Sequence, residues 1–495
     1  MSKNESVTRR GFLKKSGAAA TIGSLQFGPH LAIAADLRES GQVMVKPWTS
    51  DNPSLSRAFA PVFDERNDAR LEVQGEIPRE LRGVFMRNGP NPAFKPDDHY
   101  AYPFDGTGMI HAIYLENGRA RYRNRWVMTK EMREELAAGS RIYNSSFSAP
   151  PNADLANTNI IHHAGRYLAL FEAGVPYEID REVNTVGLFN YDGRLPAVMS
   201  AHPKLDPATG ELLSIAYNLK TGGLTYLRAN RNGQLDRIVP FSGPWATMVH
   251  DISITQDHVI AFIGPLVFDR TRPGPPATWQ PEKGTMIAIV PRNAKSADEV
   301  SWVQSPPFFQ FHTMNAFAEG DRIEVTFPWY DSYSLTRPSS RLELHRLVID
   351  TKKRTAADQA LDDQPCEFSR INDAHLGRKA RYGYVGLRDP RPAEKSQLGA
   401  FEAIARYDLQ TGSKVVHKFP AGSTVCEPVF VADPRGTAEE DGFILTFVHE
   451  QGSTGGNFVI LDARHLSAKP LAVVRLPRRV PAGLHGSWTP LKSLS

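Results

Sequence analysis

The chain has 495 residues, of which 41% are apolar and 9% aromatic, with 58 basic and 54 acidic side chains. No run of 18 apolar residues is present, which excludes a membrane-spanning helix, and two cysteines exclude a disulfide-rich scaffold or a four-thiolate metal site. The formal charge of +4 lies entirely in residues 1–34, and the rest carries 53 charges of each sign. Neither a nucleic-acid partner nor membrane association is therefore indicated.

Residues 1–34 have the layout of a twin-arginine export signal. Arg9 and Arg10 precede Gly-Phe-Leu-Lys-Lys, a stretch of small residues follows, and an Ala-x-Ala triplet ends at Ala34. A basic, frayed first helix is the alternative, but it does not account for the ordered Arg-Arg-x-Phe-Leu-Lys sequence. We expect a signal peptide at 1–34, the Tat translocase as export partner, a mature domain at 35–495 and a periplasmic or otherwise exported protein. Because this pathway carries folded proteins, a bound metal is worth seeking.

From about residue 70 the sequence repeats a strand, a Gly/Asp/Asn turn and a second strand. Two such hairpins make a four-stranded blade, so about 460 mature residues can hold seven or so blades of an all-β propeller. A large β-sandwich or two barrels is the competing architecture. The clearest predicted hairpins are 157–174, 247–264, 309–327 and 427–450, and outer hairpins are predicted at 347–356, 407–419 and 461–474.

Helical pattern is confined to residues 129–138. Thr129 is suited to the N-cap, and Glu131 lies in the first turn, where the helix dipole favours a negative charge. Met132 occupies the third helical position, so a reciprocal capping box is not expected. Residues 139–156 and 270–283 lack a strand pattern, and we predict that both are insertions over one face of the sheet array.

The candidate metal ligands are histidines that no local motif groups together. His250 and His312 lie in apolar strands, His202 precedes a proline, and His485 lies in Gly-Leu-His-Gly-Ser-Trp. Any one of them alone is more often a hydrogen-bonded core residue than a ligand. A propeller, however, directs the inner strand of every blade toward one axis, so distant histidines can converge on a single ion.

Six ordered motifs between about residues 70 and 490 resemble those of the carotenoid cleavage oxygenase family, and the bacterial branch that cleaves lignostilbene and isoeugenol is the most similar. The motifs are RNGPNP (87–92), FDGTGMIHA (104–112), AHPKLDPATGEL (201–212), MVHDISIT (248–255), CEPVFV (426–431) and GLHGSW (483–488).

This resemblance implies a seven-bladed β-propeller with a helical and loop cap, and one Fe(II) ion per subunit on the axis. Imidazole suits iron, and a carboxylate that accepts the far ring N–H fixes the tautomer of the ligand. Four neutral imidazoles leave two octahedral positions open, of which one can take dioxygen as co-substrate. The implied ligands are His202, His250, His312 and His485, and the implied orienting carboxylates are Glu172, Glu367 and Glu427.

The resemblance also implies a tyrosine and a lysine that hold a phenolic hydroxyl of the substrate. The nearest matches are Tyr100 or Tyr102, and Lys130. Two departures from the family pattern lie near the expected substrate entrance, where Thr107 replaces an aspartate and Met128 an arginine.

The two cysteines, Cys366 and Cys426, each precede one of the implied glutamates. A disulfide can form in an oxidising compartment, but alternation along a strand turns these side chains away from the axis, and we expect free thiols.

The leading functional hypothesis is an exported Fe(II) dioxygenase that uses O2 to cleave a C=C bond into two carbonyl products. The substrate is a stilbene or phenylpropanoid on one interpretation and a carotenoid or apocarotenoid on the other. The alternatives are a propeller that binds a ligand without turnover, and isomerase or oxidase chemistry on the same iron.

Overall fold

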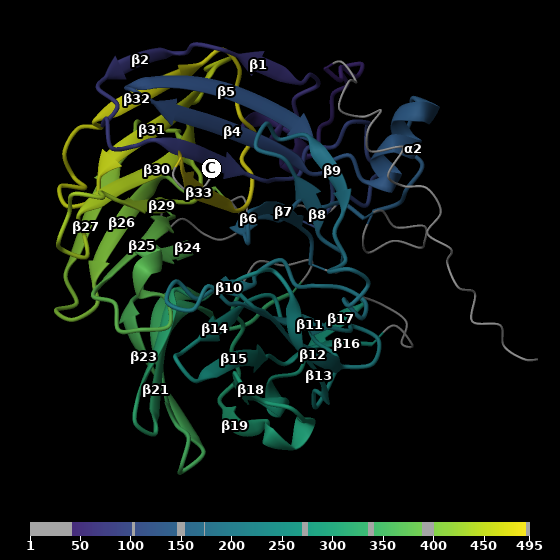
Figure 1. Ribbon diagram of the computed structural model, residues 1–495, viewed down its shortest axis with the longest axis vertical. Coiled ribbons are helices and arrows are strands. Elements are labelled where there is room, and N and C mark those ends of the chain that lie inside the picture. The colour runs from purple at the N-terminus through teal and green to yellow at the C-terminus, as the bar shows by residue number, and fades with distance from the viewer. Residues whose placement is uncertain are drawn as a thin grey trace, which may run out of the picture. The chain divides into compact units, whose positions relative to one another are not determined.

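The computed structural model describes residues 42–100, 104–145, 154–172, 174–269, 276–334, 341–388 and 400–491. The predicted export signal lies outside these residues. The described part is an all-β structure, in which α2 (Lys130–Ala138) is the only α-helix (Figure 1). As predicted, Thr129 caps this helix by accepting the Met132 N–H at 3.1 Å, and Gly139 ends it in the left-handed region at φ 65°. Within the described ranges, no helix has the length and apolarity needed to cross a bilayer.

Three sheets contain four consecutive antiparallel strands each. The first consists of β6 (Asn159–His163), β7 (Arg166–Leu170), β8 (Tyr177–Ile179) and β9 (Thr185–Leu188). The second consists of β10 (Lys204–Leu205), β11 (Leu212–Tyr217), β12 (Gly223–Ala229) and β13 (Leu235–Ser242). The third consists of β24 (Cys366–Ile371), β25 (Tyr382–Leu387), β26 (Ala403–Asp408) and β27 (Lys414–Lys418).

An eight-stranded sheet consists of two antiparallel halves that meet through one parallel pair, Gln304 opposite Thr355. Each half repeats the four-stranded unit. One half contains β14 (Ile252–Ile254), β15 (His258–Ile263), β18 (Thr285–Pro291) and β19 (Ser301–Ser305). The other contains β20 (Asn315–Glu319), β21 (Arg322–Tyr330), β22 (Leu342–Asp350) and β23 (Thr355–Asp362).

Two further sheets combine strands from both ends of the described chain. Phe85 pairs with Trp488 in one, and Val73 with Val474 in the other, so the array is closed twice. The five-stranded sheet has the order β1 (Arg66–Asp68), β5 (Arg119–Trp126), β4 (Met109–Glu116), β3 (Gly83–Arg87) and β33 (Gly486–Pro490). The six-stranded sheet has the order β2 (Glu72–Gly75), β32 (Ala472–Leu476), β31 (Gly456–Asp462), β30 (Gly442–His449) and β28 (Thr424–Val425), with β29 (Val429–Ala432) also on β30.

One predicted insertion contains a strand. Within 270–283, which the sequence predicts as free of strands, β17 (Ala277–Trp279) pairs with β16 (Leu266–Phe268). Three residues are too few to show a two-residue period, and the partner lies outside the region. The described parts of 139–156 contain no strand. Short 3₁₀ turns complete the structure at Pro53–Leu55, Arg57–Phe59, Pro281–Lys283, Ala297–Glu299 and Asp373–His375.

All seven predicted hairpins are confirmed, and the sheets are arranged like the blades of a propeller instead of the layers of a sandwich. The edge strand of each sheet, or of each half of the eight-stranded sheet, lies against the edge strand of a neighbouring sheet or half. The contacts are those of β10 with β14, β14 with β20, β24 with β29, β29 with β33, and β33 with β6. Edge strands brought together in this way place the residues at their ends close to one another.

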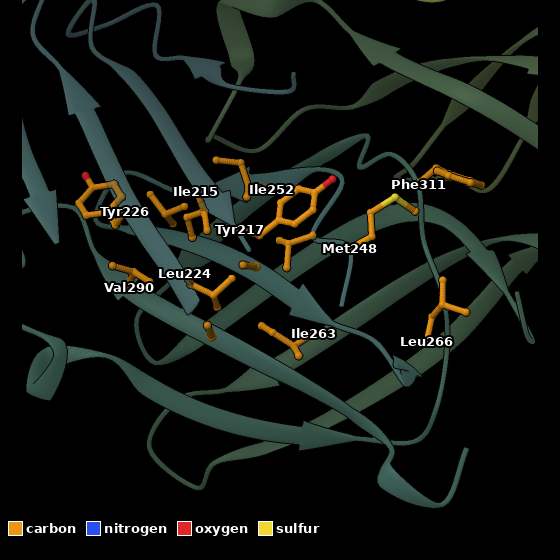
Figure 2. Packing of buried hydrophobic residues seen from close by; sticks show 14 of the residues in the cluster. Ile215, Tyr217, Leu224, Tyr226, Met248, Ile252, Ile263, Leu266, Val290 and Phe311 are labelled. Atoms are coloured by element: carbon orange, nitrogen blue, oxygen red, sulfur yellow. The ribbon is translucent and has the colours of Figure 1, made fainter. Parts of the chain in front are cut away.

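Apolar side chains of neighbouring sheets form the core. Figure 2 shows Ile215 and Tyr226 of the sheet β10–β13 in one cluster with Ile252, Ile263 and Val290 of the next sheet, and all five are buried. Alternation along each strand directs these side chains toward the adjacent sheet. The packing fixes how the edge strands approach each other.

The closure of the array makes Phe85 a sensitive position. Its side chain is 1% exposed, and its ring contacts those of Phe447 and Phe458 with centroids 5.6 and 5.1 Å away. We predict that Phe85→Ala lowers the free energy of unfolding by about 3–5 kcal/mol, because it leaves a cavity between two sheets. Denaturant unfolding measures this, with Leu188→Ala, which alters a side chain 47% exposed, as control. Equal effects of the two substitutions would contradict the prediction.

Candidate metal centre

The four predicted histidines lie together and are buried, and their candidate ligand nitrogens are all within 4.8 Å of one another. Each precedes an edge strand by one to three residues: His202 before β10, His250 before β14, His312 before β20 and His485 before β33. The entry points of four edge strands therefore meet at one place, although no sequence motif links them.

The imidazole rings are crowded. Nε2 of His250 lies 3.3 Å from Nε2 of His312, and the ring centroids of His202 and His485 are 4.5 Å apart. Nε2 of His202 is buried without a hydrogen-bond partner among the described residues. Four imidazoles this close could hold a metal ion through their lone pairs.

His312 is oriented by Glu367. Its Nδ1 lies 2.5 Å from Oε2 of the carboxylate, which also accepts the Phe368 N–H at 2.6 Å. Oε1 accepts the Tyr330 hydroxyl at 3.0 Å. Phe368 adopts φ 53° within a bulge of β24, an uncommon conformation that stores strain at this position. With Nδ1 occupied, Nε2 is the free ring nitrogen of His312.

His485 is oriented by Glu427 in a similar way. Nδ1 of His485 lies 3.0 Å from Oε1, and Oε2 accepts the Gly486 N–H at 2.8 Å. The outer partner here is a cation, since Arg370 lies 3.4 Å from Oε1. This carboxylate therefore holds both the ring and the backbone that follows it.

Glu172 follows β7, and the end of β7 lies opposite the start of the edge strand β6. Its Oε1 lies 3.2 Å from Nδ1 of His250 and 3.6 Å from Nε2 of His202, without the alignment of a hydrogen bond. Oε2 accepts the Tyr217 hydroxyl at 2.6 Å. The three predicted glutamates thus lie beside the histidines, one each at His250, His312 and His485.

The electrostatics keep the rings available as ligands. Burial and the neighbouring imidazoles lower the pKa of His202 well below its usual value, and burial also lowers the pKa of His485. Burial opposes protonation of His312 too, but the Glu367 carboxylate outweighs it and raises the pKa of that ring. Burial opposes ionisation of Glu427, yet Arg370 and His485 hold its pKa at about 2. Two of the carboxylates behind the rings, those of Glu367 and Glu427, therefore have a pKa below the usual value.

These residues fit a divalent transition-metal ion. Neutral imidazole suits iron, copper, nickel and zinc, and a ligating histidine usually donates its other ring N–H to a carboxylate or carbonyl. Within the described residues this is the one group of three or more histidine, cysteine or acidic side chains able to hold a metal.

Aromatic rings flank the histidines. Phe311 lies edge-on to His250 with centroids 5.1 Å apart, and Phe368 contacts both His312 and His485 at 5.3 and 5.1 Å. Phe309 and Tyr333 stack behind Phe311. These rings give the histidines apolar neighbours.

A cavity of about 330 Å³ reaches the histidines along the edge strands. It is lined by His202, His312 and His485, by charged groups such as Lys204, and by apolar side chains such as Phe368. The cavity therefore brings both charged and apolar groups to the histidines.

Of the predicted phenol-binding residues, the structure describes Tyr100 and Lys130. Lys130 begins α2 with its side chain 73% exposed and pairs with Glu134 at 3.6 Å. Tyr100 is buried near Gly106, and Tyr102 lies outside the described residues. Recognition of a phenol by these residues remains a prediction. The two cysteines are buried free thiols, as expected.

Sequence reasoning missed the groups behind the glutamates. Tyr217, Tyr330 and Arg370 lie in strands β11, β21 and β24, where they resemble ordinary strand residues. Burial and the adjacent carboxylates raise the pKa of both phenols well above the usual value, so they remain donors. These three partners of the glutamates can be identified only once the pairing of the strands is known.

A family model described as retinal pigment epithelial membrane protein matches residues 59–490. The carotenoid 9,10(9',10')-cleavage dioxygenase of Crocus sativus is 31% identical over 87% of this chain and 88% of its own length. The chain belongs to the carotenoid cleavage oxygenase family. This family member is also 31% identical to isoeugenol monooxygenase of Pseudomonas putida, over 88% of the chain and 98% of the relative.

Solved structures of oxygenases share the fold of this carotenoid cleavage oxygenase. Lignostilbene dioxygenase of Pseudomonas brassicacearum superposes with a TM-score of 0.84 at 30% identity, covering 90% of this chain and all of that one. Cobalt-substituted Synechocystis apocarotenoid oxygenase (ACO) gives a TM-score of 0.78 at 28% identity, covering 90% of this chain and 97% of the other. The bacterial resemblance seen in the sequence is supported.

The carboxylate behind His312 provides a test of the centre. We predict that Glu367→Gln weakens Co(II) binding about 10- to 100-fold. The carboxylate faces both His312 and Phe368 as an anion, whereas the amide that replaces it is neutral. Competition with a chromophoric chelator measures the affinity. Glu343→Gln is the matched control, since Glu343 pairs with His345 at 3.0 Å on β22. Unchanged affinity in Glu367→Gln would contradict the assignment.

Proposed function

We propose that this protein is an Fe(II)-dependent dioxygenase that cleaves a C=C bond with O2. Both oxygen atoms enter the products, one in each new carbonyl group. The proposal rests on one observation, the convergence of four buried histidines whose outer ring nitrogens face glutamates at three positions. His202, His250, His312 and His485 would hold the ion, and Glu172, Glu367 and Glu427 would orient the rings.

An iron ion held by these four imidazoles would supply the activation of dioxygen beside an alkene. The protein contributes the rest. The glutamates fix the ring tautomers, and Phe311 and Phe368 present apolar faces against the histidines. An apolar or aromatic alkene is therefore favoured over a charged substrate.

The relatives support two substrate classes, because they include enzymes named for carotenoid, isoeugenol and lignostilbene substrates. We propose a stilbene or phenylpropanoid as one class and an apocarotenoid as the other. The chain's similarity to the lignostilbene enzyme favours testing the first class first.

We also propose that the ring holds seven blades beneath a helical and loop cap. Three four-stranded sheets, two halves of the eight-stranded sheet and the two sheets that join the chain ends support the count. Helix α2 supports the cap.

Incubation of iron-loaded protein with a hydroxystilbene, isoeugenol and an apocarotenal under ¹⁸O₂ tests the activity. We predict two carbonyl products from at least one alkene, each labelled in its new oxygen, and loss of turnover in His312→Ala. The reaction must be kept short and the products analysed at once, because aldehydes exchange their oxygen with water.

Other outcomes separate the alternatives. An iron-loaded protein that converts none of these alkenes to carbonyls would contradict the proposed cleavage. Retained ligand binding by His312→Ala would then favour a binding propeller, and a rearranged alkene without added oxygen would favour an isomerase.

We further propose that residues 1–34 direct export through the twin-arginine pathway, on the sequence pattern alone. Replacing Arg9 and Arg10 by lysine should leave a full-length precursor in the cytoplasm, whereas the parent should reach the periplasm cut near Ala34. Fractionation and N-terminal sequencing of the product measure this. Equal export of both forms would contradict the proposal.

A further inference from the structure

Asp251 is a buried carboxylate next to the centre that the proposed metal ligation does not use. It is 1% exposed and lies between His250 and β14. Its Oδ1 accepts the Ile252 N–H at 2.7 Å. Its Oδ2 accepts both the N–H and the hydroxyl of Thr313, at 2.8 and 3.1 Å. Nζ of Lys204 lies 2.8 Å from Oδ1 and 2.9 Å from Oδ2.

The partners of this carboxylate lie where three different edge strands begin. Thr313 directly follows His312, Lys204 lies two residues after His202, and Ile252 lies two residues after His250. The Asp251 side chain thus links the starts of β10, β14 and β20. These edge strands are not paired with one another in the sheets, so this link constrains the distance between their starts.

We propose that Asp251 is the positioning residue that sets the spacing of His202, His250 and His312, and with it the affinity and geometry of the metal centre. This inference rests on the proposed metal function. A carboxylate suits the role because donors from three directions converge on its two oxygens. An asparagine would have to direct its NH2 group toward at least one of these donors. Lys204 balances the buried charge.

Asp206 offers a matched control. It is also 1% exposed, accepts the Ala208 N–H at 2.9 Å and pairs with Arg292 at 2.7 Å. Its substitution therefore removes a buried, paired carboxylate of similar surroundings. None of its hydrogen-bond partners is adjacent to a histidine of the centre.

The experiment is a Co(II) titration of the metal-free full chain, read by chelator competition and by the visible spectrum of the bound ion. We expect Asp251→Asn to bind Co(II) about 10- to 100-fold more weakly, as removal of an outer partner typically does, and to shift its absorption bands. Asp206→Asn should keep the parent's affinity and spectrum, whatever it does to thermal stability. Thr313→Val, which keeps the N–H donor to Asp251 but loses a hydroxyl shared between Asp251 at 3.1 Å and the Ile252 carbonyl at 2.9 Å, should change affinity and spectrum in the same direction by less.

Parent-like affinity and spectrum in Asp251→Asn, or an equal loss in Asp206→Asn, would overturn the inference. Where Asp251→Asn does not fold, parent-like binding by Thr313→Val would overturn it. A parent protein that binds no cobalt would instead count against the proposed function, so the two failures are distinguishable.

Discussion

The constraint on which this structure depends is the crowding of four buried imidazoles, whose candidate ligand nitrogens lie within 4.8 Å of one another. Burial lowers the pKa of His202 and of His485, whereas the Glu367 carboxylate raises the pKa of His312. Glutamates lie beside the outer nitrogens of three of the rings. The inner nitrogens face one another, where a cation would bind.

The β-sheets place these ligands without any local motif. Each histidine lies one to three residues before the edge strand of a different sheet or half-sheet, and the ends of the described chain are paired twice through β33 and β32. The fold therefore sets where the four histidines lie through strand positions, and local contacts refine it. Asp251 and Glu427 accept the N–H of the residue that follows a histidine, and Glu367 accepts the N–H of Phe368, so all three restrain the backbone near the centre.

Local features were predictable from the sequence. The hairpins follow from alternating residues and turn signals, and Thr129 with Gly139 defines α2 at both ends. The histidines and glutamates came from motifs that resemble a family, since no spacing rule joins residues 173 positions apart such as His312 and His485.

Features that depend on tertiary contacts were not predictable. The hydroxyls of Tyr217 and Tyr330 reach carboxylates on other strands, and Asp251 reaches partners 47 and 62 residues away. The expected role of Lys130, whose side chain is exposed at the start of α2, stays a prediction. Strand β17 was too short to recognise.

Anomalous diffraction at the absorption edge of the metal, from crystals of the metal-loaded protein, would show whether the four histidines bind one ion. We predict a single strong peak bounded by ring nitrogens of His202, His250, His312 and His485, with Nε2 the ligand atom of the last three. A peak elsewhere, or one bounded by only some of these rings, would contradict it.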